Sequence, residues 1–318
     1  MKKIVTLIFL LLVSIFVAAC GSDTSTSSDE NSAEASEEKA KTITVKHELG
    51  ETEVPVNPEK VVVFDYSTLD TLDALGVDVT AVPQDNLPDF LSKFESDEYE
   101  NAGTLFEPDF EKLSEIDPDL IIIAGRTSEA YEDLQELAPT IMMSIDSAKF
   151  VDSFSSNVTL LGEIFGKEAE AEEQLTAIKD EINATKEKAE ATGQNGLIIL
   201  TNDGGVSAYG PGSRFGFLHD ALGFAPADDT IEVSTHGQNV SFEYIAETNP
   251  DFLFVVDRNK VVGGEYSAEK TLDNELVNGT TAAQEEQIVY LNPDFWYLSG
   301  GGITSVSEMI KEVSSAIE

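Results

Sequence analysis

The sequence predicts an α/β fold with two lobes, each built on a mostly parallel sheet flanked by helices. Short apolar runs alternate with helical segments before residue 150 and again after residue 194, which is typical of buried parallel strands with crossover helices. Between about residues 152 and 191 the alternation stops, and strong helix formers dominate. We therefore expect two lobes joined by one long rigid helix, with the ligand in the cleft between the lobes.

The N-terminal lobe is expected to cover residues 42–150. The stretch TITVKHELGETEVPV alternates apolar and polar residues around Gly50 and predicts a hairpin. KVVVFDY (60–66) follows as a buried strand, and STLDTLDALG has helical spacing that stops at Gly76. The remaining predicted elements are strand and turn in VDVTAVP, helix in DFEKLSEI, strand in DLIIIAG, helix in SEAYEDLQELA and strand in TIMMSI.

The inter-lobe helix is expected over residues 151–193 and the C-terminal lobe over residues 194–318. The segment EAEAEEQLTAIKDEINATKEKAEA ends at Gly193 and would extend roughly 35 Å as a helix. After it the strand–helix alternation resumes, in order, with GLIILTND, FGFLHDALG, SFEYIAET, DFLFVVD, LVNGTTAAQ, QIVYLN and ITSVSEMIKEVSSAI.

The N-terminus has the features of an export signal. Lys2 and Lys3 precede an apolar run that ends at VAAC, where Cys20 is the only cysteine of the chain. A lone cysteine after small residues resembles a bacterial lipobox, so residues 1–19 are expected to be cleaved and Cys20 lipidated. The alternative is a plain signal peptide with an unpaired thiol. Residues 20–41 are acidic and poor in apolar residues, which predicts a disordered tether on the outer face of the cytoplasmic membrane.

The charge of the chain limits its partners. A formal net charge of −41 argues against nucleic acid and against an anionic lipid surface as ligands. An anionic ligand would have to be held by rare positive groups placed for that purpose.

Two such groups lie in an internal repeat. DFEKLSEIDPDLIIIAGR (109–126) and SFEYIAETNPDFLFVVDR (241–258) share Phe, Glu, Glu, Pro, Asp and Arg at equal spacing. The repeat places Arg126 and Arg258 after a buried strand in opposite lobes, and ligands of open α/β sheets bind outside the carboxyl ends of the strands. The first acids of the two copies, Glu111 and Glu243, would ordinarily only complement a helix dipole.

The third arginine, Arg214, follows a Gly-rich loop in YGPGSRFGFLHDALGF, where a helix is expected to begin. Backbone N–H groups at a helix start favour an anion, and guanidinium grips oxyanions with defined geometry. Arg126, Arg214 and Arg258 are therefore predicted to form an anion clamp. The alternative is that each pairs with one of the sixty acids of the chain.

Other side chains are candidates for the same cleft. His236 lies in the polar loop STHGQNVS, whereas His47 and His219 are interpreted as structural. Trp296 and Tyr297 precede three glycines in DFWYLSGGG, where they either plug the lobe or line the cleft. Tyr209, just before Gly210, is a further candidate for the cleft wall.

Motifs of common enzymes are absent from the sequence. It contains no G-x-S-x-G elbow, H-E-x-x-H pair, Cys–His zinc spacing or Walker loop, and three histidines make a His-rich metal site improbable. We expect a binding protein without an intrinsic cofactor, not an enzyme.

These features together resemble the iron-siderophore-binding lipoproteins of ABC importers. The lipobox, the tether, the opening TITVKHELGETEVPVNPEKVVVFDYSTLDTLDALG, the DPDLIII element and the inter-lobe helix carry the resemblance along the whole chain. The motifs IIIAGRTSEAY, GPGSRFG and FVVDRNK are similar to those of the branch that binds ferric catecholates such as petrobactin.

The resemblance implies roles for individual residues. The three arginines would hold the anionic ferric siderophore, and His236 and Tyr297 would complete the iron coordination if the siderophore leaves iron sites open. Glu111 and Glu243 would dock on the permease dimer, which works with its ATPase, and the protein would act as a monomer. Two alternatives remain: the same fold binding haem or a corrinoid, and an exported siderophore esterase.

Overall fold

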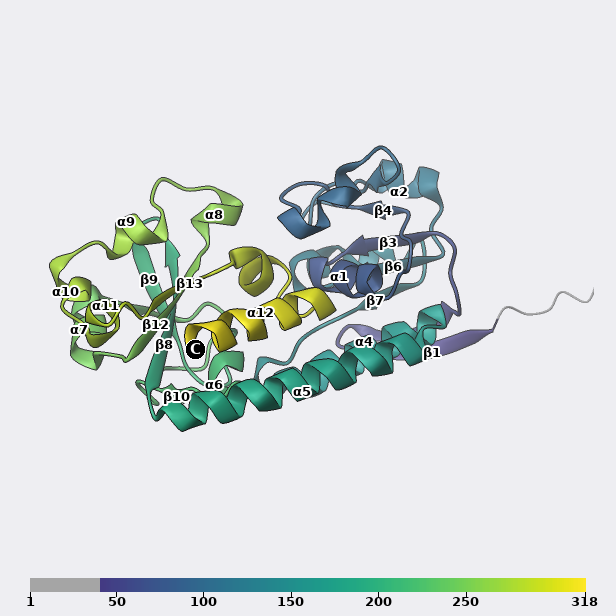
Figure 1. The fold of residues 1–318 in the computed structure, drawn as a ribbon. Helices are drawn as coiled ribbons and strands as arrows, with labels where there is room; N and C mark the ends of the chain where they lie inside the picture. Colours follow the sequence, from purple (N-terminus) through teal and green to yellow (C-terminus); the bar gives the residue numbers. More distant parts are fainter. Residues whose placement is uncertain (1–40) are drawn as a thin grey trace, which may run out of the picture. The chain divides into compact units, whose positions relative to one another are not determined.

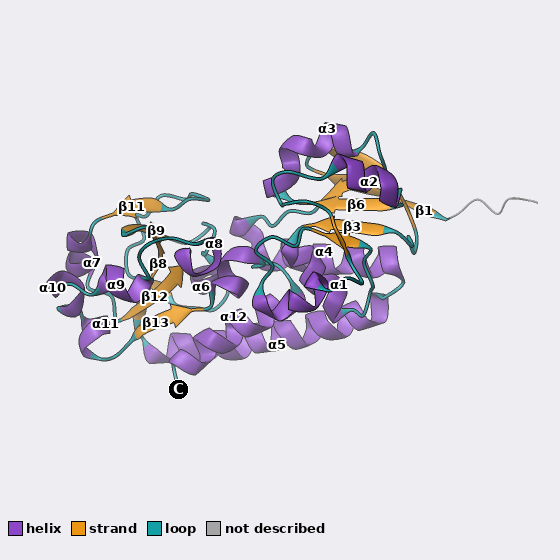
Figure 2. Ribbon diagram, turned by 90° about the horizontal axis from the view of Figure 1, so that it is seen from above, coloured by secondary structure: helices purple, strands orange, loops and turns teal. Residues whose placement is uncertain are grey.

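Two sheet-bearing lobes and a pair of long helices make up the computed structural model, which describes residues 41–318 (Figure 1). The predicted signal peptide (1–19), the lipidated Cys20 and all but the last residue of the tether (20–41) lie outside the described residues. Strands and helices alternate as the sequence predicts, and the α/β class with mostly parallel sheets is confirmed (Figure 2).

The N-terminal lobe carries a five-stranded parallel sheet in the order β5-β4-β3-β6-β7. Every residue of β3 and β6 is buried, because helices cover both faces of a parallel sheet. The predicted hairpin before the sheet is formed by two antiparallel strands. The strands are β1 (Thr42–His47), β2 (Gly50–Pro55), β3 (Val61–Phe64), β4 (Ala81–Val82), β5 (Glu100–Asn101), β6 (Leu120–Ile123) and β7 (Thr140–Met142).

Helices of this lobe are short. The segment SEAYEDLQELA gives only one α-helical turn, and its first three residues belong to the 3₁₀-helix of residues 125–130. The helices are α1 (Tyr66–Ala74), η1 (Asp89–Glu95), α2 (Phe110–Ile116), η2 (Gly125–Ala130), α3 (Tyr131–Leu134) and η3 (Ser147–Lys149).

The connection between the lobes contains two helices where the sequence predicts one. Helix α4 (Phe150–Phe165) ends at Gly166, and α5 (Glu168–Thr192) starts after Lys167. The C-terminal part of α4 packs into the N-terminal core through Leu161, Ile164 and Phe165. The 25-residue α5 is therefore the long connector, and it runs alongside both lobes in Figures 1 and 2.

The C-terminal lobe has a mixed sheet in the order β11-β9-β8-β12-β13, with β10 paired to β8. β8, β12 and β13 are parallel, whereas β9 returns antiparallel to β8 and carries the antiparallel edge strand β11. The strands are β8 (Asn195–Asn202), β9 (Gly205–Tyr209), β10 (Ala225–Pro226), β11 (Gln238–Val240), β12 (Phe252–Asp257) and β13 (Ile288–Leu291). The helices are α6 (Phe217–Asp220), α7 (Phe242–Thr248), α8 (Asn259–Val262), α9 (Ala268–Leu272), α10 (Glu275–Asn278), α11 (Thr281–Gln284), η4 (Asp294–Leu298) and α12 (Ile303–Ala316).

The sequence repeat is also a structural repeat. In both copies a seven-residue helix, α2 or α7, is capped by a side chain: Asp109 accepts from the third residue of α2, and Ser241 accepts from the third residue of α7. Both helices end on a left-handed residue, Asp117 with φ 54° and Asn249 with φ 44°. The matching geometry sets β6 and β12 at equivalent places in their sheets.

The aspartate that follows proline in each copy of the repeat, Asp119 or Asp251, has a structural role. Asp119 Oδ2 accepts the backbone N–H groups of Glu59 and Lys60 at 3.0 and 2.8 Å, next to the start of β3. Asp251 Oδ2 accepts the N–H of Asn195 at 2.9 Å, at the start of β8. Each carboxylate thus aligns the repeated strand with its central neighbour.

Helix α12 returns to the N-terminal lobe. Asp70, fully buried on α1, accepts the N–H of Thr304 at 3.0 Å and the N–H and hydroxyl of Ser305 at 2.8 and 2.6 Å. A Cβ on Gly302 would lie 2.2 Å from Asp70 Oδ2, so only glycine permits this approach. The glycine run after Tyr297 therefore serves the contact between α12 and α1.

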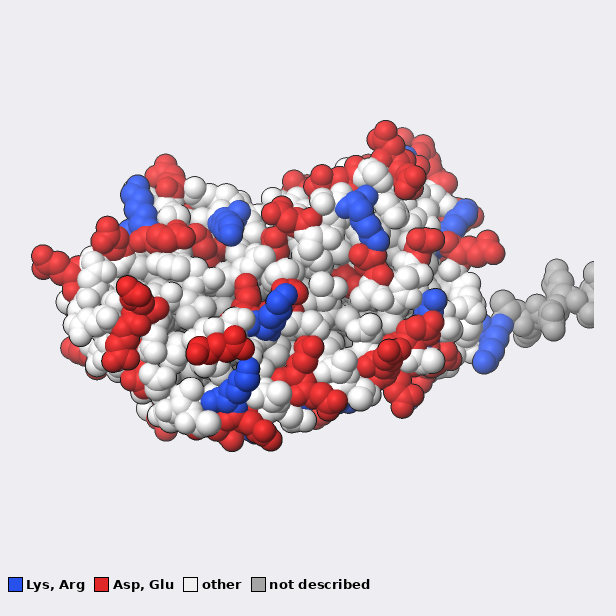
Figure 3. Space-filling view, viewed as in Figure 1, with Lys and Arg blue, Asp and Glu red and all other residues white. Residues whose placement is uncertain are grey.

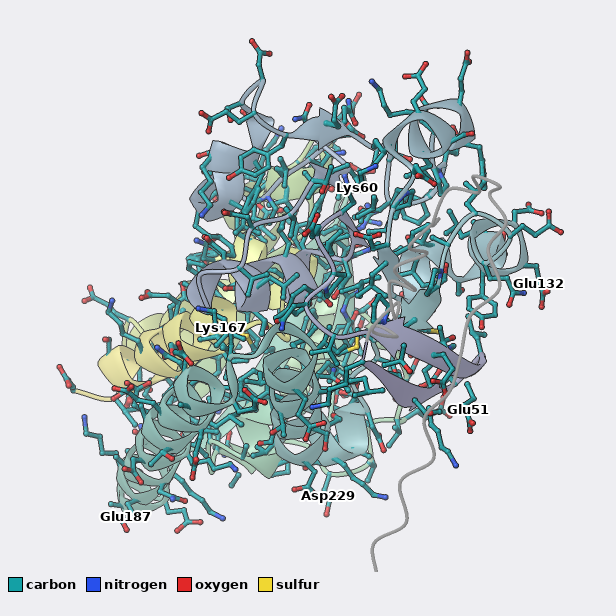
Figure 4. The ribbon with its side chains drawn as sticks, turned by 90° about the vertical axis from the view of Figure 1, so that its right-hand side faces the viewer. Glu51, Lys60, Glu132, Lys167, Glu187 and Asp229 are labelled. Atoms are coloured by element: carbon teal, nitrogen blue, oxygen red, sulfur yellow. The ribbon has the colours of Figure 1, made fainter. Side chains whose placement is uncertain are left out.

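Acidic side chains are spread in patches over the face of the molecule seen in Figure 3, with scattered basic side chains between them. Figure 4 shows Glu51, Glu132, Glu187 and Asp229 on the outside of the body, and all four are exposed. The strong negative charge of the chain is thus carried largely on its surface.

Candidate functional site

All three arginines of the chain meet at one aromatic ring. Tyr297 lies in the π-helix η4, and its ring is approached by the guanidinium carbons of Arg214 at 4.3 Å, Arg258 at 5.7 Å and Arg126 at 5.8 Å from the centroid. Such distances place the three cations within cation–π range of the ring. The predicted convergence of Arg126, Arg214 and Arg258 is present in the structure.

Two of the arginines also bind the backbone at the end of η4. Arg126 donates from Nη2 to Tyr297 O at 3.0 Å and from Nη1 to Leu298 O at 3.3 Å, and Arg214 donates from Nη2 to Tyr297 O at 2.8 Å. Carbonyl groups in the last turn of a helix lack a partner within the helix. The π-helix therefore offers acceptors to arginines of both lobes.

Arg258 binds the phenol group of Tyr297. Its Nε donates to Tyr297 Oη at 2.8 Å, and its Nη1 donates to Asn202 Oδ1 at 2.9 Å. Asn202 ends β8 beside the end of β12, where Asp257 is paired with Thr201, so sheet register brings Asn202 to Arg258. The sequence prediction did not include Asn202, although its place after a buried strand was a usable signal.

None of these arginines forms an ion pair with a carboxylate within residues 41–318. Each of the eight salt bridges there involves a lysine. The alternative that the arginines pair with acids of the chain is thus not what the structure contains. Their hydrogen-bond partners in this range are carbonyl, amide and phenol oxygens, so no carboxylate pairs directly with the cluster, although the charge of Arg126 acts on Asp65.

The electrostatics of the cluster follow from this arrangement. Burial raises the pKa of the Tyr297 phenol, but the hydrogen bond from Arg258 and the charges of the three arginines outweigh it, so the pKa of Tyr297 is lowered overall. Burial, followed by repulsion from Arg126, lowers the pKa of Arg214. Both shifts indicate a site in which one more negative charge is stabilising.

Two cavities flank Tyr297. The first, of about 370 Å³, is lined by Tyr297, Arg214 and Arg258 together with Tyr209 and His236. The second, of about 240 Å³, shares Tyr297 and Arg258 and adds Arg126 and several residues of the N-terminal lobe. The first cavity is lined by the C-terminal lobe alone and the second by both lobes, and each arginine borders at least one of them.

A third cavity, of about 430 Å³, lies at the carboxyl ends of β3, β6 and β7. Its charged lining side chains are Glu48 and Asp65, which are both acidic. This cavity therefore does not favour an anion. Of the two cavities beside Tyr297, the first is lined by two arginines and no acid, and the second by two arginines and one acid, Asp85, so both favour an anion more.

The histidines lie as the sequence suggested. His236 is exposed in the loop before β11 and shares the first cavity with Tyr297. His219 Nδ1 lies 3.0 Å from Phe224 O, and His47 packs edge-on against Tyr131 with a ring separation of 5.6 Å. Only His236 therefore borders the arginine cluster.

Tyr209 and Trp296 have different positions. Tyr209 lines the first cavity but is otherwise buried against Phe215, at a ring separation of 4.5 Å, and burial raises its pKa to about 12. For Trp296, a candidate for ligand binding, the sequence leaves open whether it plugs the lobe or lines the cleft. The residue is 2% exposed and lines neither cavity beside Tyr297, so it plugs the lobe. The π-helix turns its indole into the core, where Nε1 donates to Glu312 Oε2 at 2.9 Å.

The expected helix start at Arg214 also needs correction. Helix α6 has four residues, and the N–H of Gly212 donates to Asp220 Oδ2 at 2.7 Å. This backbone group is already satisfied by a carboxylate of the chain, so the arginine itself supplies the anion-binding character at this position.

The described residues contain no group of three or more His, Cys, Asp or Glu side chains able to hold a metal ion. A metal at this site would need most of its ligands from a bound molecule.

Residues 61–295 match the model of a protein family described as periplasmic binding protein. The chain belongs to the periplasmic binding protein family. It is 46% identical over 322 residues to the petrobactin-binding protein YclQ of Bacillus subtilis (strain 168), with all of both chains covered. It is 31% identical to the ferric-anguibactin-binding protein FatB of Vibrio anguillarum (strain ATCC 68554 / 775), over 85% of this chain and 86% of that protein.

Solved structures agree with this membership of the periplasmic binding protein family. The crystal structure of YclQ from Bacillus subtilis superposes with a TM-score of 0.86 at 48% identity, covering 87% of this chain and 99% of that chain. The catecholate-siderophore binding protein VctP of Vibrio cholerae gives 0.82 at 34% identity, covering 86% and 100%. These relatives are named as binding proteins and not as enzymes, in agreement with the sequence prediction.

The periplasmic binding protein fold leaves two predicted docking residues on the surface. Glu111 and Glu243 are both exposed in the first turns of α2 and α7. A hydrogen bond to its own backbone N–H, followed by one from Ser241, lowers the pKa of Glu243. Among helices in residues 41–318, none is long and apolar enough to cross a membrane.

Proposed function

We propose that this protein captures a ferric catecholate-type siderophore, similar to ferric petrobactin, and delivers it to the permease of an ABC importer. The observation that carries the proposal is the cluster of three arginines around Tyr297, none of which pairs with a carboxylate of residues 41–318. Two relatives named for binding petrobactin and ferric anguibactin align with 100% and 85% of this chain, and they support the same substrate class.

The chemistry of a ferric catecholate suits this cluster. The complex is anionic and bulky, and its ligand rings present aromatic faces. Guanidinium groups donate charge-assisted hydrogen bonds to oxyanions and also stack on rings. Because Arg126, Arg214 and Arg258 use only neutral acceptors, a ligand oxygen can replace a carbonyl without breaking an ion pair.

The iron is cargo in this proposal, and two side chains are proposed to reach it. His236 and Tyr297 share the first cavity, so both can offer a ligand atom if the siderophore leaves iron sites open. Phenolate is a hard ligand suited to a ferric ion, and the lowered pKa of Tyr297 favours its ionised form. Tyr209, with its raised pKa, is proposed as a wall only.

Other ligands fit the site less well. Haem or a corrinoid needs one axial ligand and does not call for three convergent guanidinium groups. An esterase needs an activated nucleophile, and the sequence has no serine elbow. The positive cluster favours a ligand with several anionic oxygens over both alternatives.

Delivery and location complete the proposal. Glu111 and Glu243 are exposed on matching helices of the two lobes and are proposed to contact the permease dimer, which works with its ATPase. Cys20 is proposed to carry a lipid that holds the protein, as a monomer, on the outer face of the cytoplasmic membrane. The lone cysteine after VAA supports this anchor.

The proposal is tested by titrating the soluble body with ferric petrobactin, a second ferric catecholate, a ferric hydroxamate and haemin. Trp296 is the only tryptophan and directly precedes Tyr297, so its fluorescence should report binding. Tight quenching by the catecholates alone is the expected result. Preferential binding of haemin or hydroxamate, or binding of none of the four, would contradict it.

A further inference from the structure

An exposed phenylalanine stands at the second cavity. Phe106 is 70% exposed, and it lines the cavity of about 240 Å³ together with Arg126, Arg258 and Tyr297. A single exposed apolar side chain is ordinary, but a ligand in this cavity would bury part of the ring, so it is the position of Phe106 at the cavity that points to a role in binding. No helix, strand or core cluster of residues 41–318 uses this ring.

The loop that carries Phe106 is rigidly built. Thr104 Oγ1 accepts the N–H groups of Phe106 at 3.2 Å and Glu107 at 2.9 Å, and Thr104 N donates to Glu107 O at 3.0 Å. Gly103 has a φ of 104°, and a Cβ there would lie 2.5 Å from Glu107 O. These contacts hold the turn in one form, so the exposed position of Phe106 is a built feature of the loop.

The same loop is tied to the arginine cluster. Thr127, buried and adjacent to Arg126, donates its hydroxyl to Leu105 O at 2.6 Å. The residue before Phe106 is thereby fastened to the residue after Arg126. The aromatic ring and the guanidinium are positioned together at the carboxyl end of β6.

The opposite wall of this cavity is also apolar. Val262, 37% exposed, comes from the C-terminal lobe, and Leu298 ends the π-helix. The cavity therefore combines two guanidinium groups with an aromatic ring, aliphatic walls and the ring of Tyr297, and Asp85 is the one carboxylate in its lining. A flat aromatic group bearing anionic oxygens satisfies both kinds of lining at once.

We infer that Phe106 is a specificity-determining residue that packs on an aromatic ring of the bound anion. The inference rests on the proposed function and adds a selection for aromatic ligand arms to the selection for charge. Aromatic pairs contribute beyond the area they bury, so losing this contact should weaken binding about tenfold.

The test compares Phe106→Ala, Phe106→Leu and Phe106→Tyr in titrations with ferric petrobactin, with Leu276→Ala as a control. Leu276 is 40% exposed on α10 and lines neither cavity beside Tyr297. We expect about tenfold weaker binding for the Ala variant, a partial loss for Leu and near wild-type affinity for Tyr, with melting temperatures unchanged throughout.

Each outcome is informative. If the wild-type protein binds and Phe106→Ala binds equally well, the role of Phe106 is overturned and the proposed function stays intact. The same holds if Phe106→Leu binds as tightly as Phe106→Tyr. Equal losses in the Phe106 and Leu276 variants would also reject a specific contact. Absence of binding by the wild-type protein overturns the proposed function, and the role of Phe106 with it.

Discussion

Arg258 Nε donates to Tyr297 Oη at 2.8 Å, so an arginine from the repeated unit of the C-terminal lobe holds the phenol at the centre of the cleft. Arg126, the matching arginine of the N-terminal lobe, binds the backbone carbonyl of the same tyrosine. The two copies of the repeat therefore act on one residue from opposite sides. This relationship leads to the first prediction.

Tyr297 should ionise below the usual pKa of a tyrosine, which is about 10. The hydrogen bond and charges of the arginines lower its pKa, whereas burial raises the pKa of Tyr66, Tyr209, Tyr244 and Tyr290. Phenolate absorbance should show one early titration that disappears in Tyr297→Phe and moves upward in Arg258→Gln.

The linked effect on stability has a definite sign. A phenol whose folded pKa is depressed stabilises the fold fully above its unfolded pKa, and this contribution is lost as pH falls through the folded pKa. Compared with Tyr297→Phe, the wild-type protein should therefore gain stability as pH rises through that window. An unchanged difference across the window would show that the arginines do not act on the phenol.

Replacing Arg126, Arg214 or Arg258 singly by Ala should weaken ferric catecholate binding by about ten- to hundredfold. A charge-assisted hydrogen bond contributes about 1.5–3 kcal/mol, which sets this range. Melting temperatures should change little, because no carboxylate within residues 41–318 loses its partner. Lysine at the same positions should restore little, since it lacks the planar fork.

A matched control for the arginines is Lys186→Ala, which removes an exposed cation of α5 paired to Glu190. Binding measured by fluorescence quenching should be unaffected in that variant. If all four substitutions weakened binding equally, the effect would come from net charge and not from the clamp.

Gly302→Ala should destabilise the protein strongly. The added Cβ would lie 2.2 Å from Asp70 Oδ2 and would separate the carboxylate from the N–H groups of Thr304 and Ser305. Buried donors left without an acceptor cost about 1–3 kcal/mol each. Chemical denaturation should show the loss, and Gly125→Ala, where the added Cβ meets open space, should not.

Glu111→Ala and Glu243→Ala should impair iron uptake without impairing binding. Both carboxylates are exposed and lie outside the two cavities beside Tyr297. Uptake of labelled ferric siderophore should fall most in the double variant, whereas Glu187→Ala, an exposed acid on α5, should behave as wild type. Reduced ligand affinity in the double variant would instead assign these residues to the site.

Cys20→Ala should release the protein from the membrane. Without the thiol, no diacylglycerol can be attached, and the protein should appear in the soluble extracellular or periplasmic fraction. Fractionation with an antibody to the body measures this directly. Retention in the membrane fraction would refute the lipid anchor.

Local signals in the sequence predicted the strands and the convergence of the arginines. Arg126 and Arg258 follow buried strands, and sheet topology alone brings the ends of such strands to the cleft. The 25-residue α5 was predicted by its composition, whereas its separation from α4 at Gly166 was not. From sequence alone, a glycine inside a helical pattern does not show whether the helix continues or ends, because that depends on the packing on each side.

The partners of Arg126 and Arg214 could not be predicted, because they are backbone carbonyls at the end of a π-helix. A π-helix has no residue pattern of its own, and one extra residue per turn rotates Trp296 into the core and Tyr297 into the cleft. The seating of α12 on α1 likewise joins residues 70 and 305, which no sequence period relates.

The contact between Asp70 and Ser305 also bears on how the cleft can move. The segment from Leu291 to Ile303 leaves the C-terminal sheet at β13 and is fastened to the N-terminal lobe at the start of α12. Tyr297 therefore lies on the segment that links the two lobes, and not on the sheet of either lobe. A rotation of one lobe against the other would twist this segment and change the spacing between the phenol and its guanidinium groups. Binding and release of the ligand would then be coupled to lobe rotation through Tyr297 and the three arginines around it.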